Sequence, residues 1–145
     1  MKAKCLNEAG DMTWAVILDR GDEVLDCLSG FAERHELSAG RVTGIGAFSR
    51  ATLGFFDRES KDYVKIEIDE QTEVLSMLGD IALADGKPKL HLHVVLGKRD
   101  GSAHGGHLLA GSVWPTLEVI ITESPSYLKR THDAETGLPL IDISP

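Results

Sequence analysis

Most of the chain alternates apolar and polar residues, and this period of two constrains the fold more than any other feature. The clearest case is Tyr63–Asp69, where three apolar side chains alternate with three charged ones. Asp85-Gly86 and Asp100-Gly101 are dipeptides that favour the tight turns of hairpins. The pattern predicts strands over Met12–Asp19, Arg41–Phe56, Tyr63–Asp69, Glu73–Ala84, Lys89–Lys98, His107–Val113 and Leu117–Thr122, with one or two short strands around Ala134–Gly137.

One segment has helical periodicity instead. Asp22 is its expected N-cap, and the helix is expected to end near Leu37, before Gly40. One amphipathic helix with a large, mostly antiparallel sheet predicts an α+β domain in which the helix covers one face of the sheet. The remaining sheet surface leads us to expect a homo-oligomer. The apolar side of the helix consists of Val24, Leu25, Leu28, Phe31 and Ala32.

Acidic residues outnumber basic ones, with Asp+Glu 23 against Lys+Arg 15 and a formal net charge of −8. This balance argues against a purely electrostatic grip on nucleic acid or on an anionic membrane. No apolar run approaches the ~20 residues of a spanning helix, and the first residues lack a signal-peptide pattern. Cys5 and Cys27 do not form a zinc-ribbon or redox spacing. We therefore expect a single cytoplasmic domain over residues 1–145, with no membrane partner.

Four of the six histidines lie between positions 91 and 107. In the strand around Leu92, a period of two places His91 and His93 on one face, about 7 Å apart along the strand. The next turn brings His104 and His107 alongside, and the two glycines between them allow a close backbone approach. Three imidazoles fit a zinc site with one open position, although nickel, copper and iron accept the same ligands. We predict His91, His93 and His107 as metal ligands, with His104 as the alternative third ligand or as a residue that supports the ligands.

A site of this kind also permits catalysis, because a metal lowers the pKa of its bound water to about 7. Such chemistry needs a carboxylate to carry protons. Glu118 is the first candidate, because it lies off the apolar face formed by its strand neighbours; Glu67 and Asp100 are further candidates. For each of the three, the alternative is an ordinary solvated carboxylate.

The histidine-containing segment resembles a known family. The run from His91 to Leu108 (HLHVVLGKRDGSAHGGHL), with TGIGAFS at 43–49 and TLEVI at 116–120, is similar to the landmarks of the plants-and-prokaryotes-conserved (PPC) domain. The resemblance covers nearly the whole chain. It implies an α+β fold with a curved, mostly antiparallel sheet, a homotrimer, and the zinc site of prokaryotic members, which corresponds here to His91, His93 and His107.

The function implied by the resemblance depends on a second element. Descriptions of the family often include DNA binding, because plant members join the domain to an AT-hook with an Arg-Gly-Arg-Pro core. This sequence contains no such core, and its basic residues are scattered. We therefore expect a stand-alone, homotrimeric, metal-binding domain with an assembly or regulatory role, acting through protein partners or a small-molecule ligand at the metal. The alternatives are a small zinc-dependent enzyme, with a site that resembles that of acetolactate decarboxylase, and a DNA-binding regulator.

Overall fold

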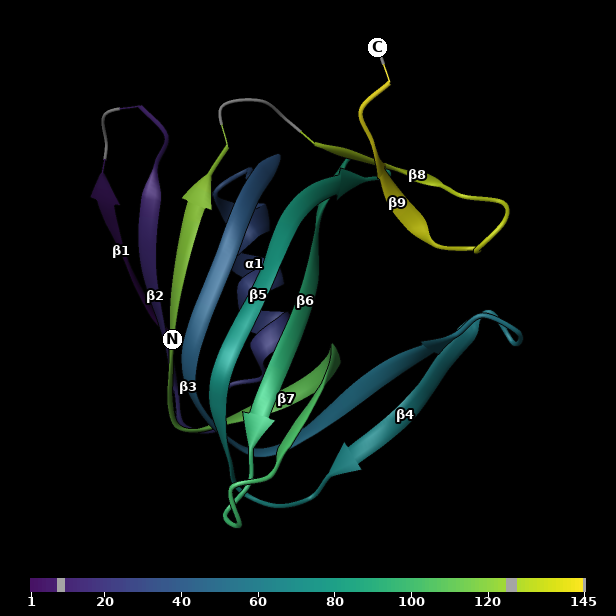
Figure 1. Ribbon diagram of the computed structural model, residues 1–145. Helices are drawn as coiled ribbons and strands as arrows, with labels where there is room; N and C mark the ends of the chain where they lie inside the picture. The colour runs from purple at the N-terminus through teal and green to yellow at the C-terminus, as the bar shows by residue number, and fades with distance from the viewer. Residues whose placement is uncertain (8–9, 125–127, 145) are drawn as a thin grey trace.

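The computed structural model describes residues 1–7, 10–124 and 128–144, and in these residues a single helix packs on a large, strongly bent sheet (Figure 1). This confirms the predicted α+β class. The elements are β1 (Lys2–Asn7), β2 (Thr13–Asp19), α1 (Val24–Arg34), β3 (Ala39–Asp57), β4 (Asp62–Ile68), β5 (Thr72–Ala84), β6 (Lys87–Gly97), β7 (Ala103–Glu123), β8 (Lys129–His132) and β9 (Pro139–Asp142).

The sheet has the strand order β1-β2-β7-β3-β5-β8-β9, with β4 paired to β3 and with β6 paired to both β5 and β7. The long strands β3 and β7 bend where their shared ladder shifts register, between Gly46 and Leu53 of β3. Beyond the bend β3 pairs with β4, and this arm extends away from α1 in Figure 1. The ladders between strands are antiparallel, except for a single parallel pair between Leu83 of β5 and Lys129 of β8. The sheet is therefore curved and mostly antiparallel.

The helix begins one residue later than predicted. Its N-cap is Glu23, whose carboxylate accepts hydrogen bonds from the backbone N–H groups of Asp26 and Gly111, each at 2.9 Å. Asp22, the predicted cap, instead accepts from the N–H of Asp19. The longer glutamate side chain reaches from the start of the helix to Gly111 of β7. A prediction from hydrophobic periodicity cannot detect this contact, because the two residues are far apart in the sequence. The buried side of α1 is Val24, Leu28, Phe31 and Ala32, and it packs against β6 and β7.

The segment from Ala103 to Glu123 forms one strand, β7, where the sequence predicts two. The gap between the two predicted strands contains Trp114-Pro115, and proline lacks the N–H that a ladder needs. The ladder with β3 passes directly from the pair Gly46–Leu117 to the pair Phe48–Val113. Pro115 lies in this irregularity, where no regular cross-strand hydrogen bond is lost.

The sequence prediction misses the first strand and agrees with the short strands near the other end. β1 was not predicted; it pairs with β2 at the edge of the sheet. The short strands predicted around Ala134–Gly137 are β8 and β9, and Ala134–Gly137 forms the turn between them, where Gly137 has a φ of 77°. Asp133 organises this turn by accepting hydrogen bonds from the backbone and hydroxyl of Thr136. No helix in the described ranges is long and apolar enough to cross a membrane.

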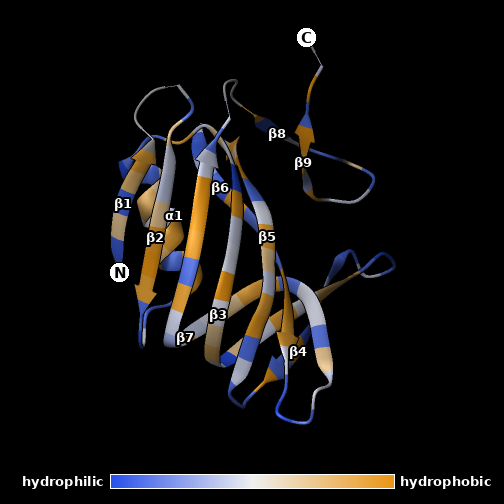
Figure 2. Ribbon diagram, turned by 60° about the vertical axis from the view of Figure 1, so that its left-hand side comes forward, coloured by the Kyte–Doolittle hydropathy of each residue, from blue (hydrophilic) through white to orange (hydrophobic). Residues whose placement is uncertain are grey.

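Burial alternates along the strands and so separates a core face from an outer face. The ribbon in Figure 2 shows apolar and polar residues following one another along the strands. Core side chains of β2, β3, β5, β6 and β7 pack with α1 and are almost completely buried. On the outer face, apolar side chains remain exposed, among them Ile45, Leu78, Val95 and Ile120. One cross-strand row on this face runs from β2 through β7, β3, β5 and β6 and returns to β7, and its members are Ala15, Ile120, Thr43, Leu78, His93 and His107.

Candidate metal centre

The three predicted ligands lie together at the end of this row. Leu92 and Val94 of β6 are buried, so His91 and His93 lie on the opposite face of the strand, with their Nε2 atoms 3.1 Å apart. His107 is contributed by β7, directly across the ladder from His93. One ring nitrogen from each histidine can be chosen so that all three atoms lie within 4.8 Å of one another. The prediction that these three side chains converge is therefore met.

Glycine at two positions permits this convergence. A Cβ at Gly106 would lie 2.9 Å from the carbonyl oxygen of Gly54 in β3, so the residue before His107 has to be small for β7 to approach β3. A Cβ at Gly79 of β5 would lie 2.0 Å from the carbonyl oxygen of His91. The close approach of neighbouring strands thus fixes the backbone on both sides of the cluster.

His104 is not part of the group. It pairs with Leu96, whereas His107 pairs with His93 along the same uninterrupted ladder. Because the two histidines are three positions apart, an odd spacing, their side chains leave β7 on opposite faces. Leu96 is fully buried on the core face, and His104 shares that side of the ladder. The structure therefore does not bring His104 to the cluster, where the sequence allowed it as an alternative.

The surroundings favour neutral imidazoles. Burial, with smaller contributions from the nearby His91 and His93, lowers the pKa of His107 from 6.5 to about 4. Burial and the charge of Arg130 also lower the pKa of His91. At neutral pH these rings therefore offer lone pairs rather than positive charge, which is the state that metal ligation requires.

The donor set fits a transition metal. At a Zn–N distance of 2.0–2.1 Å, two nitrogens of a tetrahedral site are about 3.3 Å apart, close to the 3.1 Å between the two Nε2 atoms. The buried Nδ1 of His107 has no hydrogen-bond partner among the described residues. A buried polar atom without a partner is unfavourable and calls for a ligand or a bound species nearby.

The predicted carboxylates lie elsewhere. Glu118 is exposed on β7 between Ile17 and Ile45, nine β3 positions from the residue that pairs with His107. Glu67 accepts the hydroxyl hydrogen of Thr52 at 2.8 Å, and Asp100 accepts hydrogen bonds from Ser102 in the β6–β7 turn. Among the described residues, none of the three has a carboxylate oxygen within the histidine group.

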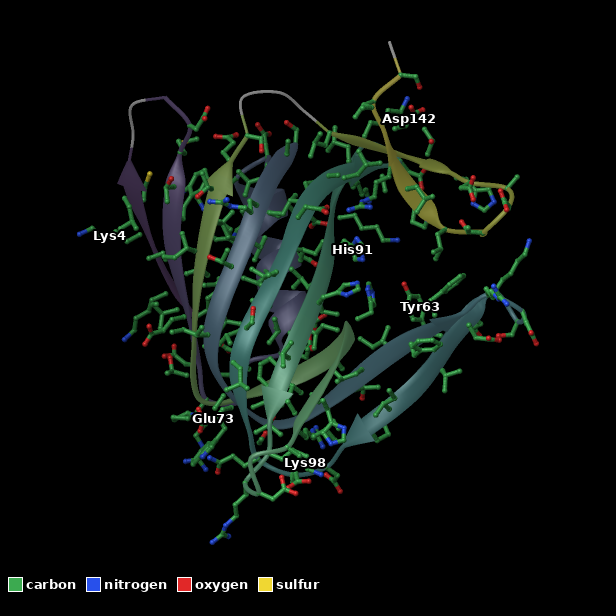
Figure 3. The ribbon with its side chains drawn as sticks, viewed as in Figure 1. Lys4, Tyr63, Glu73, His91, Lys98 and Asp142 are labelled. Atoms are coloured by element: carbon green, nitrogen blue, oxygen red, sulfur yellow. The ribbon has the colours of Figure 1, made fainter. Side chains whose placement is uncertain are left out.

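Sequence reasoning missed the residues that surround the cluster. The ring of Tyr63, from β4, stacks on His107 with centroids 4.8 Å apart and an interplanar angle of 25°. Asp80 of β5 pairs with His91, and its carboxylate accepts a hydrogen bond from the buried guanidinium of Arg130 in β8. Figure 3 shows His91 on β6 and Tyr63 on β4 directed toward the same space. Asp80 and His91 face each other in the β5–β6 hairpin, and the Asp85-Gly86 turn in the sequence could have predicted this pairing. The sequence contains no comparable signal for the contacts of Tyr63 and Arg130.

Comparison with known proteins agrees with this architecture. The chain matches the model of the Plants and Prokaryotes Conserved (PCC) domain over residues 7–125. It is 37% identical to a metal-containing protein of Archaeoglobus fulgidus, with a TM-score of 0.82 and coverage of 89% of this chain and 91% of the other. A plant- and prokaryote-conserved protein of Pyrococcus horikoshii is 29% identical, with a TM-score of 0.85 and coverage of 92% of both chains.

Two further relatives carry different descriptions. A candidate DNA-binding protein of Bacteroides thetaiotaomicron is 26% identical, with a TM-score of 0.87 and coverage of 97% of this chain and 96% of the other. The bifunctional protein GlmU of Synechococcus sp. (strain JA-3-3Ab) is 32% identical over 120 residues, which are 81% of this chain. The chain spans only 18% of the length of that relative. Through the family match over most of its length and the shared bent sheet, this chain belongs to the Plants and Prokaryotes Conserved domain family.

Proposed function

We propose that this protein is a homotrimeric metal-binding domain with an assembly or regulatory role, in which His91, His93 and His107 hold one transition-metal ion. The convergence of the three ring nitrogens within 4.8 Å is the observation that carries the proposal. The depressed pKa of His107 supports it, because the ring needs no deprotonation at neutral pH. The similarity to a metal-containing protein of Archaeoglobus fulgidus supports it further.

Zinc is the metal that we propose. Three neutral imidazoles with one open coordination position are typical of zinc sites that bind water or a small ligand. Nickel, copper and iron(II) accept the same nitrogen ligands, so the experiment must identify the element as well as count it.

Metal content tests the site directly. We expect close to one zinc per chain by inductively coupled plasma mass spectrometry of untagged protein purified without chelators. His93→Ala should lose the metal, because it removes one of three ligands from an exposed position with little effect on folding. His104→Ala is the matched control, because it removes a histidine from the same β6–β7 hairpin but outside the group. Metal-free native protein, or equal metal loss in both variants, contradicts the proposal.

The exposed apolar side chains of the outer face support the trimer. Ile45 and Leu78 are 58% and 57% exposed, and both lie on β-sheet surface that α1 does not cover. Exposed apolar surface of this kind is typical of an interface between subunits. Light scattering after size exclusion should give about three times the 15.7 kDa chain mass, and Leu78→Asp should shift the mass toward one chain. A monomeric wild-type protein at micromolar concentration excludes the trimer.

A zinc-dependent enzyme is the second candidate, and one observation favours it. A pocket lined by His91, His107 and Tyr63 adjoins the cluster, so a small molecule has access to a metal held there. None of the predicted carboxylates is placed to carry protons at this point. Asp80, the carboxylate beside His91, is occupied by its ion pair with Arg130.

A further inference from the structure

The pocket beside the histidine cluster has both polar and apolar residues in its lining. Its volume is about 160 Å³, and its walls come from β4, β6, β7, β8 and β9. The polar groups of its lining are two imidazoles, a lysine amine and a guanidinium, and the other lining residues are aliphatic apart from Tyr63. The lining residues are Tyr63, Lys89, Leu90, His91, His107, Arg130, Leu138, Pro139 and Leu140.

Arg130 is a buried charged residue of this lining. The residue is only 8% exposed, which is exceptional for an arginine. Its two terminal nitrogens donate to the carboxylate of Asp80 and, at 3.2 Å, to the carbonyl oxygen of Pro139. Its Nε is buried and has no hydrogen-bond partner among the described residues. A buried, rigidly held guanidinium whose Nε–H has no partner is a typical recognition group for a carboxylate.

The charges around the pocket favour an anion. Lys89 and Arg130 are cationic, and Asp80 is the acidic group paired with Arg130. The histidine cluster contains no carboxylate, so a divalent ion held there adds positive charge beside the pocket. This field attracts an anion more strongly than an uncharged ligand.

The apolar residues of the lining favour a ligand whose anionic group is joined to a small apolar body. Leu90, Leu138, Pro139 and Leu140 supply aliphatic surface, and Tyr63 supplies an aromatic ring. An apolar cavity of about 150 Å³ accommodates benzene in another protein, so about 160 Å³ suits a single ring or a short branched chain. Inorganic anions would leave this surface uncovered.

We propose that this pocket binds a small monocarboxylate with a compact apolar body, with the carboxylate beside Arg130 and the histidines and the apolar body against Leu138 and Leu140. The inference rests on the proposed metal site, because the ion supplies part of the attraction for the carboxylate. It extends that proposal by giving the ligand class that the metal-bearing domain would recognise.

Calorimetric titration of zinc-loaded protein with benzoate tests the proposal, with zinc content measured on the same sample. Acetate keeps the carboxylate without the ring, and benzyl alcohol keeps the ring without the charge. We expect saturable benzoate binding, at least tenfold weaker binding of both partial probes, and about tenfold weaker benzoate binding after zinc is removed. Each tenfold corresponds to about 1.4 kcal/mol.

Two lysines of β6 provide matched variants. Lys89→Gln removes a charge that lines the pocket, and we expect a several-fold loss of benzoate affinity. Lys87→Gln removes the same charge from the same exposed strand end outside the pocket, and we expect benzoate affinity to be unchanged. Arg130→Gln should abolish binding; because Arg130 also holds β8 to β5, its result counts only together with that of Lys89→Gln.

The outcomes separate the two proposals. If zinc-loaded protein does not bind benzoate, or binds benzyl alcohol with equal affinity, the proposed carboxylate site is overturned and the proposed metal site is unaffected. Equal affinities of the Lys89→Gln and Lys87→Gln variants also overturn it. Protein that takes up no zinc overturns the proposed metal site. If that protein still binds benzoate, the proposal of a carboxylate-binding pocket stands alone, and if it does not, both proposals are overturned.

Discussion

Replacing Gly79 by alanine should destabilise the protein through a backbone contact next to the histidine cluster. A Cβ at this position would lie 2.0 Å from the carbonyl oxygen of His91 and 2.7 Å from Cδ2 of Leu92. Carbon–oxygen contacts in sheets are normally about 3.3 Å or longer, so β6 would have to move away from β5 by about 1.3 Å at His91. The Leu92 side chain can rotate, but the carbonyl oxygen belongs to the ladder and cannot.

The size of the effect follows from two opposing contributions. An added methyl group in a well-packed region costs about 1–3 kcal/mol, and a contact with backbone lies at the upper end of that range. Alanine recovers about 0.4–1 kcal/mol by restricting the unfolded chain. We therefore expect a loss of about 2 kcal/mol, which lowers Tm by about 4–8 °C in a chain of this length. The displaced His91 should also weaken zinc binding.

Urea unfolding and calorimetry of metal-free protein measure the stability, and zinc titration measures the affinity. Gly105→Ala is the control, because its Cβ would lie 3.3 Å from the carbonyl oxygen of Val94 and needs only a small adjustment. We expect its stability to stay within about 1 kcal/mol of the wild type. If Gly79→Ala proves as stable as Gly105→Ala, the strand contact at His91 does not limit the site and the reasoning fails.

Three further predictions concern other parts of the molecule. Glu23→Ala should lower the free energy of unfolding in urea by about 1–2 kcal/mol, because it removes hydrogen bonds from the N–H groups of Asp26 and Gly111. Glu33→Ala, on the exposed last turn of the helix, should lower it by less than about 0.5 kcal/mol, and equal losses in the two variants would refute the capping role. Metal-free protein should lose stability as the pH falls from about 6.5 to 4, because His107 becomes protonated near pH 6.5 in the unfolded chain but only near pH 4 in the folded chain. His107→Gln should reduce the pH dependence of the urea midpoint, and an unchanged dependence would contradict this prediction. Fluorescence anisotropy should show no binding of duplex DNA at about 0.15 M salt, because the net charge is −8; tight binding that persists at this and higher salt would refute the charge argument.

The sequence was sufficient for features that depend on short-range periodicity. The alternation around Leu92 predicted that His91 and His93 share a face, and the Asp100-Gly101 turn predicted that His107 returns to them. In the pairing of β6 with β7, the same alternation places His104 on the core face, opposite to His107. The prediction that His104 could replace His107 failed to use the odd spacing between the two residues.

The rest of the site depends on pairings that no local pattern reveals. Tyr63 reaches His107 because β3 bends and brings β4 over the cluster, and Arg130 reaches Asp80 because β8 joins β5. Each contact links segments more than 40 positions apart in the chain. The shifted helix start has the same cause, since Glu23 is selected as the cap by its reach to Gly111 of β7.

The way in which β8 and β9 attach to the molecule has a consequence for rates. Within the described chain these two strands pair with each other. They join the rest of the molecule through the Leu83–Lys129 pair, the Arg130–Asp80 ion pair and two backbone hydrogen bonds of Leu128, with Leu83 and Ser38. A two-stranded ribbon held at so few points opens at a much lower free energy than the central strands. The wall of the pocket that carries Leu140 can therefore come away while the rest of the sheet stays folded, and molecules can exchange with the pocket faster than the protein unfolds.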